Sequence, residues 1–412
     1  MFSKSLLIAL ILSFAATAQG QNQFQVLHAF TGGSDGGGVW DSPAFDNKGN
    51  LYGTTSGGGT HNGGTVFALA PQANGEWSET VLHNFPSSPN DGGAPNGGPM
   101  LDPSGNVYGT TTDGGAYNCG MVYELTPGDG GWTETVLYNF CAHPNDAGAS
   151  GASLIMDSTG NLYGAAFFPF EVSPNLNGSW TETVLHVFTG ENGDGYGAAA
   201  GLIMDSAGNL YGDTAHGGGL GGCIIFGCGT VYELRPVREA ARGVWSERIL
   251  YLFGAFVGDG ELPSFGQLAM DRFGNLYGAT SAGGSDGRGT VFKLSPTPAT
   301  PTGEWVETIL HNFVGGASGL EPGGGVILDN AGNLYGTTIA GGSPLCGCGV
   351  VYKLTPGPGG EGQYTLLHTF VGSDGAQPDA NLTLGPDGNL YGTTATGGTG
   401  GAGVVFEIQI AP

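Results

Sequence analysis

The sequence predicts an all-β protein, a seven-bladed β-propeller of four-stranded blades whose ring is closed by an N-terminal strand. Three observations lead to this prediction: a repeated Gly-Asn-Leu-Tyr-Gly motif, strand-like segments in every repeat, and an offset between the two ends of the chain. Without a period, 83 glycines and 23 prolines among 412 residues would favour disorder. With a period, they indicate many tight turns between short strands.

The Gly-Asn-Leu-Tyr-Gly motif occurs seven times, with Val107 in place of leucine in the second copy. Successive motif tyrosines are 48 to 66 residues apart, which indicates one repeated supersecondary unit. Because stacked units share one continuous core, residues 19–412 are predicted to form a single domain. The tyrosines that anchor the seven repeats are Tyr52, Tyr108, Tyr163, Tyr211, Tyr277, Tyr335 and Tyr391.

Each repeat contains four segments typical of strands. The first is a short apolar stretch such as residues 154–156, followed by an Asp-x-x-Gly-Asn turn in which glycine takes the positive φ. The second is Asn-Leu-Tyr-Gly-Thr-Thr, and a glycine-rich loop leads to the third, such as residues 64–69. The fourth, such as residues 77–85, begins with Trp-x-Glu. Alternating apolar positions and β-branched residues favour strands, and we expect no helix in the mature chain.

The two ends of the chain each carry part of a repeat. The last repeat ends at its third strand, residues 403–408, whereas residues 24–30 precede the first repeat and match the fourth strand. The N-terminal strand is therefore expected to complete the last blade and cover its open edge. A solenoid is the alternative architecture, but it would not require this complementation.

The pattern Asp-x-x-Gly-Asn-Leu-Tyr-Gly-Thr-Thr, followed by Gly-Thr-Val-Phe and Trp-x-Glu-Thr-Val-Leu-His-x-Phe, resembles the GloVer tandem repeat of exported bacterial proteins. The resemblance extends over nearly all of residues 24–408, and the first part is also similar to NHL-type propeller repeats. It implies export and a propeller, and it implies no established activity. The chain departs from the family habit of a C-terminal sorting tail, so we expect no surface anchor.

Residues 1–18 have the pattern of a secretory signal peptide. Lys4 supplies the positive charge, residues 6–14 are apolar, and Ala16-Thr17-Ala18 is a cleavage site. The apolar run is too short to span a bilayer, and no second one follows. We therefore expect a secreted or periplasmic monomer with no membrane insertion.

The chain is strongly acidic, with 35 acidic and 10 basic residues and a formal charge of −25. This balance opposes binding to nucleic acids, which requires clustered basic side chains, and to anionic membranes. A solvated acidic exterior is one interpretation of the charge. Binding of Ca²⁺ by loop carboxylates is the other, and it makes Ca²⁺ the candidate cofactor.

Six cysteines in an exported chain indicate disulfide bonds. A hairpin of the third and fourth strands in the second repeat places Cys119 opposite residue 140 or 141, which favours a bond to Cys141. Cysteines close in sequence suggest the other two pairs, and a metal site is the alternative. The predicted disulfides are Cys119–Cys141, Cys223–Cys228 and Cys346–Cys348.

The loop between strands two and three and the crossover between blades are expected on one face, which we call the top face. The crossovers carry acidic side chains, mostly in Asp-Gly pairs, which either form a ring of carboxylates for cations or serve as turn residues. These candidates are Asp35, Asp91, Asp146, Asp194, Asp259 and Asp374.

Five of the eight histidines share one repeat position, where tyrosine stands in the other two copies, so we expect an aromatic packing position with a polar tip. They are His28, His83, His186, His311 and His368, and the tyrosines are Tyr138 and Tyr251.

The remaining histidines, His61, His143 and His216, fall in predicted top-face loops. With Asp146 or Asp194 they are candidates for acid–base catalysis or metal binding, and three unrelated loop histidines are the alternative. Trp40 is the one tryptophan outside the repeat position, and it could stack on a sugar ring or cap the first blade.

Two classes of function remain open. The first is an exported, non-enzymatic propeller that binds a glycan, a peptide or a cell-envelope component through its top-face loops. The second is a secreted lyase or hydrolase that acts on a polysaccharide or a small cyclic compound, either with a metal or without one. A purely adhesive role is a third hypothesis. The chain contains no nucleophile elbow, zinc-protease helix or phosphate-binding loop. Convergence of the three loop histidines on one pocket would favour the enzyme.

Overall fold

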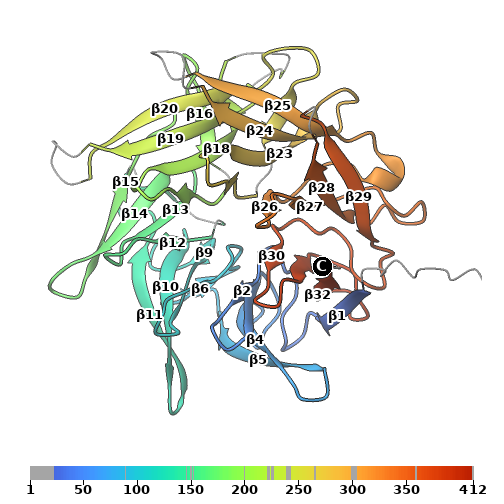
Figure 1. Cartoon of the computed structure of the whole chain (residues 1–412). Helices are drawn as coiled ribbons and strands as arrows, with labels where there is room; N and C mark the ends of the chain where they lie inside the picture. The colour runs from blue at the N-terminus through green and yellow to red at the C-terminus, as the bar shows by residue number, and fades with distance from the viewer. Residues whose placement is uncertain are drawn as a thin grey trace, which may run out of the picture.

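The protein is a ring of seven β-sheets, or blades, arranged around a central axis (Figure 1). This confirms the predicted seven-bladed propeller. The predicted signal sequence, residues 1–18, lies outside the part of the chain that the computed structural model describes. The described residues are 23–88, 90–144, 146–148, 151, 153–198, 200–219, 223, 227–237, 243–263, 266–297, 304–357 and 360–410.

The innermost strand of each blade has only two or three residues and lies next to the axis. In the order of blades 1 to 7, these strands are β2 (Ala44–Phe45), β7 (Met100–Leu101), β12 (Ile155–Met156), β17 (Ile203–Met204), β22 (Ala269–Met270), β26 (Val326–Leu328) and β30 (Thr383–Leu384).

The second strand of each blade contains the Leu-Tyr-Gly motif and is mostly buried. These strands are β3 (Leu51–Thr55), β8 (Val107–Thr110), β13 (Leu162–Ala165), β18 (Leu210–Gly217), β23 (Leu276–Gly283), β27 (Leu334–Thr338) and β31 (Leu390–Thr394). The third strands are β4 (Thr65–Pro71), β10 (Met121–Gly128), β14 (Pro169–Pro174), β19 (Thr230–Pro236), β24 (Thr290–Pro296), β28 (Val350–Pro356) and β32 (Val404–Gln409).

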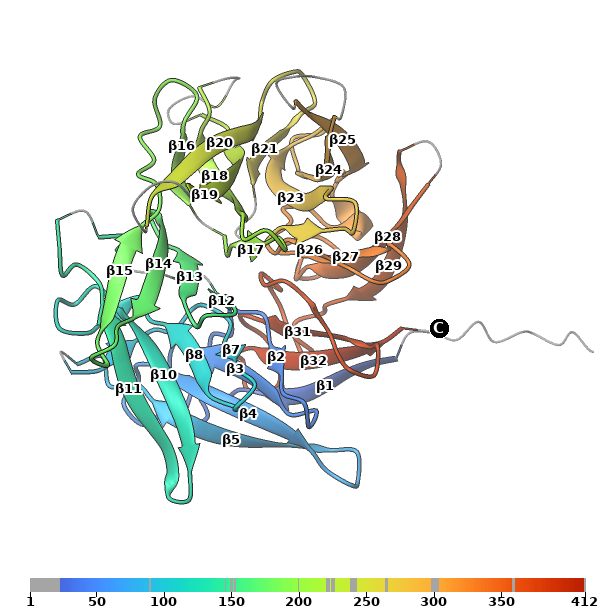
Figure 2. The same ribbon diagram turned by 60° about the vertical axis from the view of Figure 1, so that its left-hand side comes forward.

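The fourth and outermost strand begins with tryptophan in four of the seven blades. In blades 1 to 6 these strands are β5 (Trp77–Asn84), β11 (Gly131–Asn139), β15 (Trp180–Val184), β20 (Trp245–Leu252), β25 (Trp305–Asn312) and β29 (Gly362–Thr369). In blade 7 the position is taken by β1 (Gln23–Ala29), which pairs antiparallel with β32. The two ends of the described chain therefore lie side by side in both views, and the predicted ring closure is confirmed (Figures 1 and 2).

The crossovers and the loops between second and third strands lie on the same face, because they pair with one another. The short strands β6 (Gly92–Gly93) and β9 (Asp113–Gly114) form one such pair in blade 2. β16 (Gly195–Ala198) and β21 (Gly260–Pro263) add to the extended second strands of blades 4 and 5. This is the top face that the sequence predicts. The one helix among the described residues is the 3₁₀ turn η1 (Gly316–Ser318).

The repeated motif has a packing role between blades. In the turn before β3, Asp46 Oδ1 accepts hydrogen bonds from the backbone N–H groups of Lys48 and Asn50, both 2.8 Å away. The Tyr52 hydroxyl donates to Asp46 Oδ2, and the Tyr52 ring packs edge-on against Trp132 of the next blade, 6.4 Å between centroids. Tyr163 with Trp245 and Tyr391 with Trp77 make the same contact, so tyrosine, turn aspartate and tryptophan recur because they join neighbouring blades.

Three disulfides are present, in the pairs that the sequence predicts: Cys119–Cys141, Cys223–Cys228 and Cys346–Cys348. No cysteine in the described part of the chain is free. Disulfides persist in oxidising surroundings, so these bonds indicate an oxidising, extracellular environment. Among the described residues, no helix has the length and hydrophobicity that a membrane span requires.

Candidate functional site

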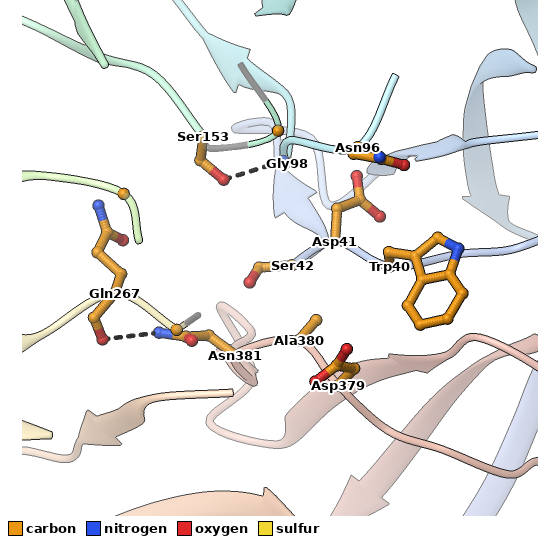
Figure 3. Close-up of a pocket in the computed structure, with 13 residues that line it drawn as sticks. Trp40, Asp41, Ser42, Asn96, Gly98, Ser153, Gln267, Asp379, Ala380 and Asn381 are labelled. Atoms are coloured by element: carbon orange, nitrogen blue, oxygen red, sulfur yellow. Dashed lines mark hydrogen bonds between the residues drawn. The ribbon is translucent and has the colours of Figure 1, made fainter. Parts of the chain in front are cut away.

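A pocket of about 370 Å³ opens where the crossovers reach the innermost strands, at the axis of the propeller (Figure 3). Its lining comes from residues that stand two to four positions before the innermost strand in six of the seven blades. The lining residues are Trp40, Asp41, Ser42, Asn96, Gly98, Gly151, Ser153, Gly201, Gly266, Gln267, Asp379, Ala380 and Asn381.

Polar side chains on one side of the pocket bond to the backbone of other blades. Ser153 Oγ accepts the N–H of Gly98 at 2.9 Å, and Asn381 Oδ1 accepts the N–H of Gly325 at 2.8 Å. The Asn381 amide also donates to the carbonyl of Gln267 at 3.1 Å, which joins blades 7 and 5 across the axis. Gln267 Nε2 in turn donates to the carbonyl of Leu202 in blade 4. These bonds hold the pocket floor in a fixed shape.

Glycines allow the blades to approach each other at this floor. A Cβ atom on Gly266 would lie 1.5 Å from the backbone nitrogen of Gly325, and one on Gly98 would lie 2.6 Å from the carbonyl oxygen of Ser42. Neither position can accept a side chain without displacing backbone. The small residues before the innermost strands are therefore a steric requirement of the ring.

Blades 7, 1 and 2 supply a second group of lining residues whose side chains have no partner. The side chains of Trp40, Ser42, Asn96 and Asp379 form no hydrogen bond or ion pair with the described residues. Oδ1 of Asn96 and Oδ1 of Asp379 are buried and unpaired. The Trp40 side chain is 42% exposed. Figure 3 shows Trp40, Asn96 and Asp379 on one side of the pocket, opposite the bonded side chains of Gln267 and Ser153, with Ser42 between the two sides.

Asp41 lies between these groups and the interior of blade 1. Its Oδ2 accepts hydrogen bonds from the Thr54 backbone N–H at 3.0 Å and the Thr54 hydroxyl at 2.9 Å, while Oδ1 has no partner. Only 3% of Asp41 is exposed, and burial raises its pKa to about 8 although the Thr54 hydrogen bonds oppose the shift. Burial also raises the pKa of Asp379. Both carboxyl groups therefore keep a proton more readily than ordinary aspartates.

The loop histidines lie outside this pocket. His61 is exposed after β3, with Nδ1 3.0 Å from the Thr60 hydroxyl, and His143 is exposed in the crossover after β11. His216 lies in β18, opposite Tyr196 of β16. None of the three lines the central pocket or belongs to a group of three metal-ligating side chains in the described part of the chain. Of the sequence candidates, Trp40 alone lines the pocket.

The crossover aspartates lie beside the histidine or tyrosine of the repeated position, at the junctions between blades. His83 Nε2 is 3.2 Å from Asp91 and 3.8 Å from Glu134, which belongs to the fourth strand of the next blade. Where tyrosine replaces histidine, the Tyr251 hydroxyl lies 3.2 Å from Asp259 Oδ2 and 3.1 Å from Glu307 Oε2.

The same arrangement recurs at five of the seven junctions. The remaining three trios are His28, Asp35 and Glu79; Tyr138, Asp146 and Glu182; and His186, Asp194 and Glu247.

Two junctions carry aromatic contacts in place of the glutamate. His311 stacks on Tyr364 with 4.8 Å between ring centroids, and His368 stacks on Phe24 at 3.7 Å. His368 Nε2 remains 3.0 Å from Asp374. The packing role predicted for the repeated histidine position is therefore present at every junction, with a carboxyl or an aromatic ring as the partner.

Two of the junction trios have the chemistry to hold a metal. The ligand atoms of His83, Asp91 and Glu134 lie within 4.8 Å of one another, as do those of His186, Asp194 and Glu247. The Ca²⁺ prediction for Asp35, Asp91, Asp194, Asp259 and Asp374 stays a prediction. Each of these aspartates has a histidine or tyrosine neighbour that accounts for its position without an ion.

The sequence analysis did not single out Asp41, Asn96 or Asp379. A signal was available for Asp41, because the other six repeats have glycine or alanine at its position, three residues before the innermost strand. Asn96 and Asp379 stand one position earlier, where the repeats share no residue type. Aligning the repeats on the first strand, rather than on the crossover aspartates, would have identified Asp41.

Comparisons with known proteins agree with the fold. A family model described as the Gloeobacter/Verrucomicrobia repeat matches residues 13–226 and 226–412. None of the curated proteins matches the chain. Among solved structures, a fungal alcohol oxidase of the AA5 family, in complex with copper, is 16% identical over 95% of this chain and 77% of that chain, with a TM-score of 0.55.

Two further solved structures are more distant. A Bacteroides fragilis protein provisionally described as a 6-phosphogluconolactonase is 12% identical over 86% of each chain, with a TM-score of 0.47. A Thermus thermophilus protein provisionally described as a glucose dehydrogenase is 14% identical over 94% of this chain and 99% of that chain, with a TM-score of 0.41. At 16% identity and a TM-score of 0.55, the likeness to the alcohol oxidase supports the fold alone.

Proposed function

The chain belongs to the Gloeobacter/Verrucomicrobia repeat family, and we propose that it is an exported binding protein that holds a small carbohydrate ligand in its central pocket. The observation that carries this proposal is the group of unpartnered side chains on blades 7, 1 and 2. Polar groups that are buried without a hydrogen bond cost free energy unless a ligand or water satisfies them. Placed beside a floor whose polar groups are already bonded, they are available for a ligand.

The kinds of side chain in this group favour a sugar. A sugar ring presents an apolar face, which the exposed indole of Trp40 can cover, and an edge of hydroxyl groups. Ser42, Asn96 and Asp379 offer a hydroxyl, an amide and a carboxyl to that edge. The cavity of about 370 Å³ falls within the range of roughly 300–1,000 Å³ that is usual for small-molecule sites. The glycan class of partner is therefore favoured over a peptide or another envelope component.

Two features support export. The three disulfides form under oxidising conditions. Residues 1–18 have the charge, apolar run and cleavage site of a secretory signal peptide. The site of action proposed here is accordingly the periplasm or the medium, where free and surface-bound glycans occur.

A glycan array followed by calorimetry tests the proposal. We expect the mature protein to bind at least one class of saccharide, and Trp40→Ala to weaken that binding about tenfold, which corresponds to about 1.4 kcal/mol. Tyr117→Ala is the matched control, because Tyr117 is 56% exposed and does not line the pocket. Absence of saccharide binding, or equal affinity of the Trp40 variant, would remove the proposal.

A second candidate function is a lyase or hydrolase that acts on a polysaccharide or a small cyclic compound. The observation that favours it is the raised pKa of Asp41 and Asp379, because a carboxyl that keeps its proton near neutral pH can act as a general acid. Incubation with polysaccharides, followed by measurement of new reducing ends and of unsaturated products, tests it. Turnover that disappears in Asp379→Asn would favour the enzyme.

A further inference from the structure

The pocket is acidic and contains no basic group. Its lining includes two carboxyl groups, Asp41 and Asp379, and no lysine, arginine or histidine among the described residues. The whole chain carries a formal charge of −25, so no distant excess of positive charge compensates them. Because Coulomb interactions strengthen as water is excluded, a positive ligand group is favoured here and an anionic one is disfavoured.

Asp379 is the carboxyl that a ligand can reach. Its Oδ1 is buried against blade 6, where a Cβ on Gly323 would lie only 2.1 Å away, and Ile339 packs on the same side. Its Oδ2 is not among the buried unpaired atoms and forms no hydrogen bond with the described residues. Oδ1 therefore occupies the space that the missing side chain of Gly323 leaves, and Oδ2 is open to the pocket.

Asp41 supplies a second unsatisfied carboxyl oxygen in the same pocket. The residue is 3% exposed, with Oδ2 held by Thr54 and Oδ1 unpaired. A buried polar group without a partner is retained at a cost in stability, and such groups cluster at functional sites. The unpaired Oδ1 is an observation independent of Asp379 that indicates a missing hydrogen-bond partner.

Size distinguishes an organic cation from a metal ion. Ca²⁺ requires six to eight oxygen ligands at about 2.3–2.6 Å. Neither Asp41 nor Asp379 belongs to a described group of three ligand side chains gathered within 4.8 Å, and the cavity of about 370 Å³ is far larger than an ion. The face of the exposed Trp40 indole, on the same wall, can hold a cation as well as a sugar ring.

Building on the proposed function, we propose that the ligand is an amino sugar whose ammonium group binds Asp379 while its ring packs against Trp40. The ammonium supplies the positive charge and the hydrogen-bond donors that the wall lacks. Ser42 and Asn96 are left to bond the hydroxyl groups of the sugar. Selectivity over the neutral sugar then depends on one charge pair in a partly desolvated site.

The test compares three disaccharides of the same linkage by calorimetry: one of glucosamine, one of N-acetylglucosamine and one of glucose. We expect the glucosamine disaccharide to bind the mature protein at least about tenfold more tightly than the other two. Asp379→Asn should abolish this preference. Asp286→Asn, which removes one exposed charge from a top-face loop, should preserve it.

Each other outcome overturns a defined part of the argument. Equal affinity for glucose and glucosamine would remove the ammonium inference and leave the proposed function intact, whereas no binding of any sugar would remove both. Tighter binding of choline than of glucosamine would assign the site to a simple ammonium compound. Binding of Ca²⁺ alone that is lost in Asp379→Asn would assign it to a metal. Because the disaccharide comparison uses the unmodified protein, it remains decisive even if Asp379→Asn fails to fold.

Discussion

Two regions of this propeller, the junctions between blades and the central pocket, hold carboxyl groups, and the regions differ in what surrounds those groups. At the junctions, a crossover aspartate meets a histidine or tyrosine of its own blade and a glutamate of the next. In the pocket, Asp379 has no such partner and Asp41 is bonded through one oxygen. One oxygen of Glu79, Glu134, Glu247 and Glu307 is also buried and unpaired at the junctions, but none of these glutamates lines the central pocket. A carboxyl enclosed between blades belongs to the scaffold, whereas an unbonded one beside a cavity is available to a ligand.

The junctions themselves are of two kinds. In the acidic kind, two carboxyl groups approach each other, and a single tyrosine hydroxyl, as at Tyr251, can donate to only one of them. One carboxyl must therefore keep a proton. In the aromatic kind, His311 stacks on Tyr364 and its Nε2 is buried without a partner. The two kinds should respond to pH in opposite directions.

The largest expected effect is a loss of stability as pH rises. Burial, assisted by the charge of Asp35, raises the pKa of Glu79 to about 7, and burial also raises the pKa of Glu134, Glu182, Glu247 and Glu307. A carboxyl with a raised folded-state pKa contributes stability that is complete below its unfolded value of about 4.3 and disappears as pH rises through about 7. We expect the melting temperature to fall between about pH 5 and pH 7 and to level off near pH 8.

A variant series connects this fall to the junctions. Glu79→Gln keeps the shape of the side chain without the titration, so it should flatten part of the pH dependence. The exposed Glu304→Gln should leave the dependence unchanged. A melting temperature that is constant from about pH 5 to pH 7 would show that the junction glutamates ionise freely in the folded protein.

Removal of one junction hydroxyl should have the next largest effect. Tyr251→Phe leaves Asp259 and Glu307 without their shared donor, and loss of a buried hydrogen-bond partner costs about 1–3 kcal/mol. Unfolding in denaturant should show this decrease in the free energy of unfolding. Tyr117→Phe removes an exposed hydroxyl and should cost almost nothing. Equal stability of the two variants would mean that the junction carboxyl groups satisfy each other.

A smaller effect, of opposite sign in pH, is expected at the aromatic junction. Burial lowers the pKa of His311 to about 4, so its contribution to stability is complete above its unfolded value of about 6.5 and is lost as pH falls toward 4. His311→Phe should therefore gain up to about 2 kcal/mol relative to the parent protein at pH 5, and less at pH 8.

His368→Phe provides the comparison for the aromatic junction. Burial lowers the pKa of His368, but Asp374 at 3.0 Å opposes the shift, so the gain at pH 5 should be smaller. Thermal melts of both variants at the two pH values measure the difference. A gain for His368→Phe that equals the gain for His311→Phe would mean that Asp374 has no electrostatic role at its junction.

The architecture could be predicted because the features that determine it are local and repeated. Tyr52, its turn aspartate and Trp132 recur at fixed spacing, and the order of the segments required residues 24–30 to complete blade 7. The disulfides could also be predicted, because the hairpin of β10 and β11 places Cys119 near Cys141. In each case neighbours in sequence or register define the contact.

The site could be predicted only in part, because it depends on seven blades meeting at one axis. Trp40 was recognisable as an exception to the repeat. Asp379 and Trp40 are more than three hundred residues apart in the sequence. Only closure of the ring brings both of them to one pocket. The link between five of the crossover aspartates and a glutamate of the next blade, such as Asp91 with Glu134, was missed for the same reason.

The smallest expected change in stability is at the pocket. Asp379→Asn removes a carboxyl that has no donor to lose, so the free energy of unfolding should stay constant or rise by at most about 1 kcal/mol. Asp259→Asn is the matched change at a junction, where the carboxyl accepts the N–H groups of Ala255 and Gly260 at 2.7 Å, and it should destabilise clearly. If unfolding in denaturant shows equal losses for the two variants, Asp379 is part of the scaffold and the distinction between the regions fails. If Asp379→Asn is as stable as the parent protein and loses only ligand binding, the Asp379 carboxyl serves the ligand and folding does not require it.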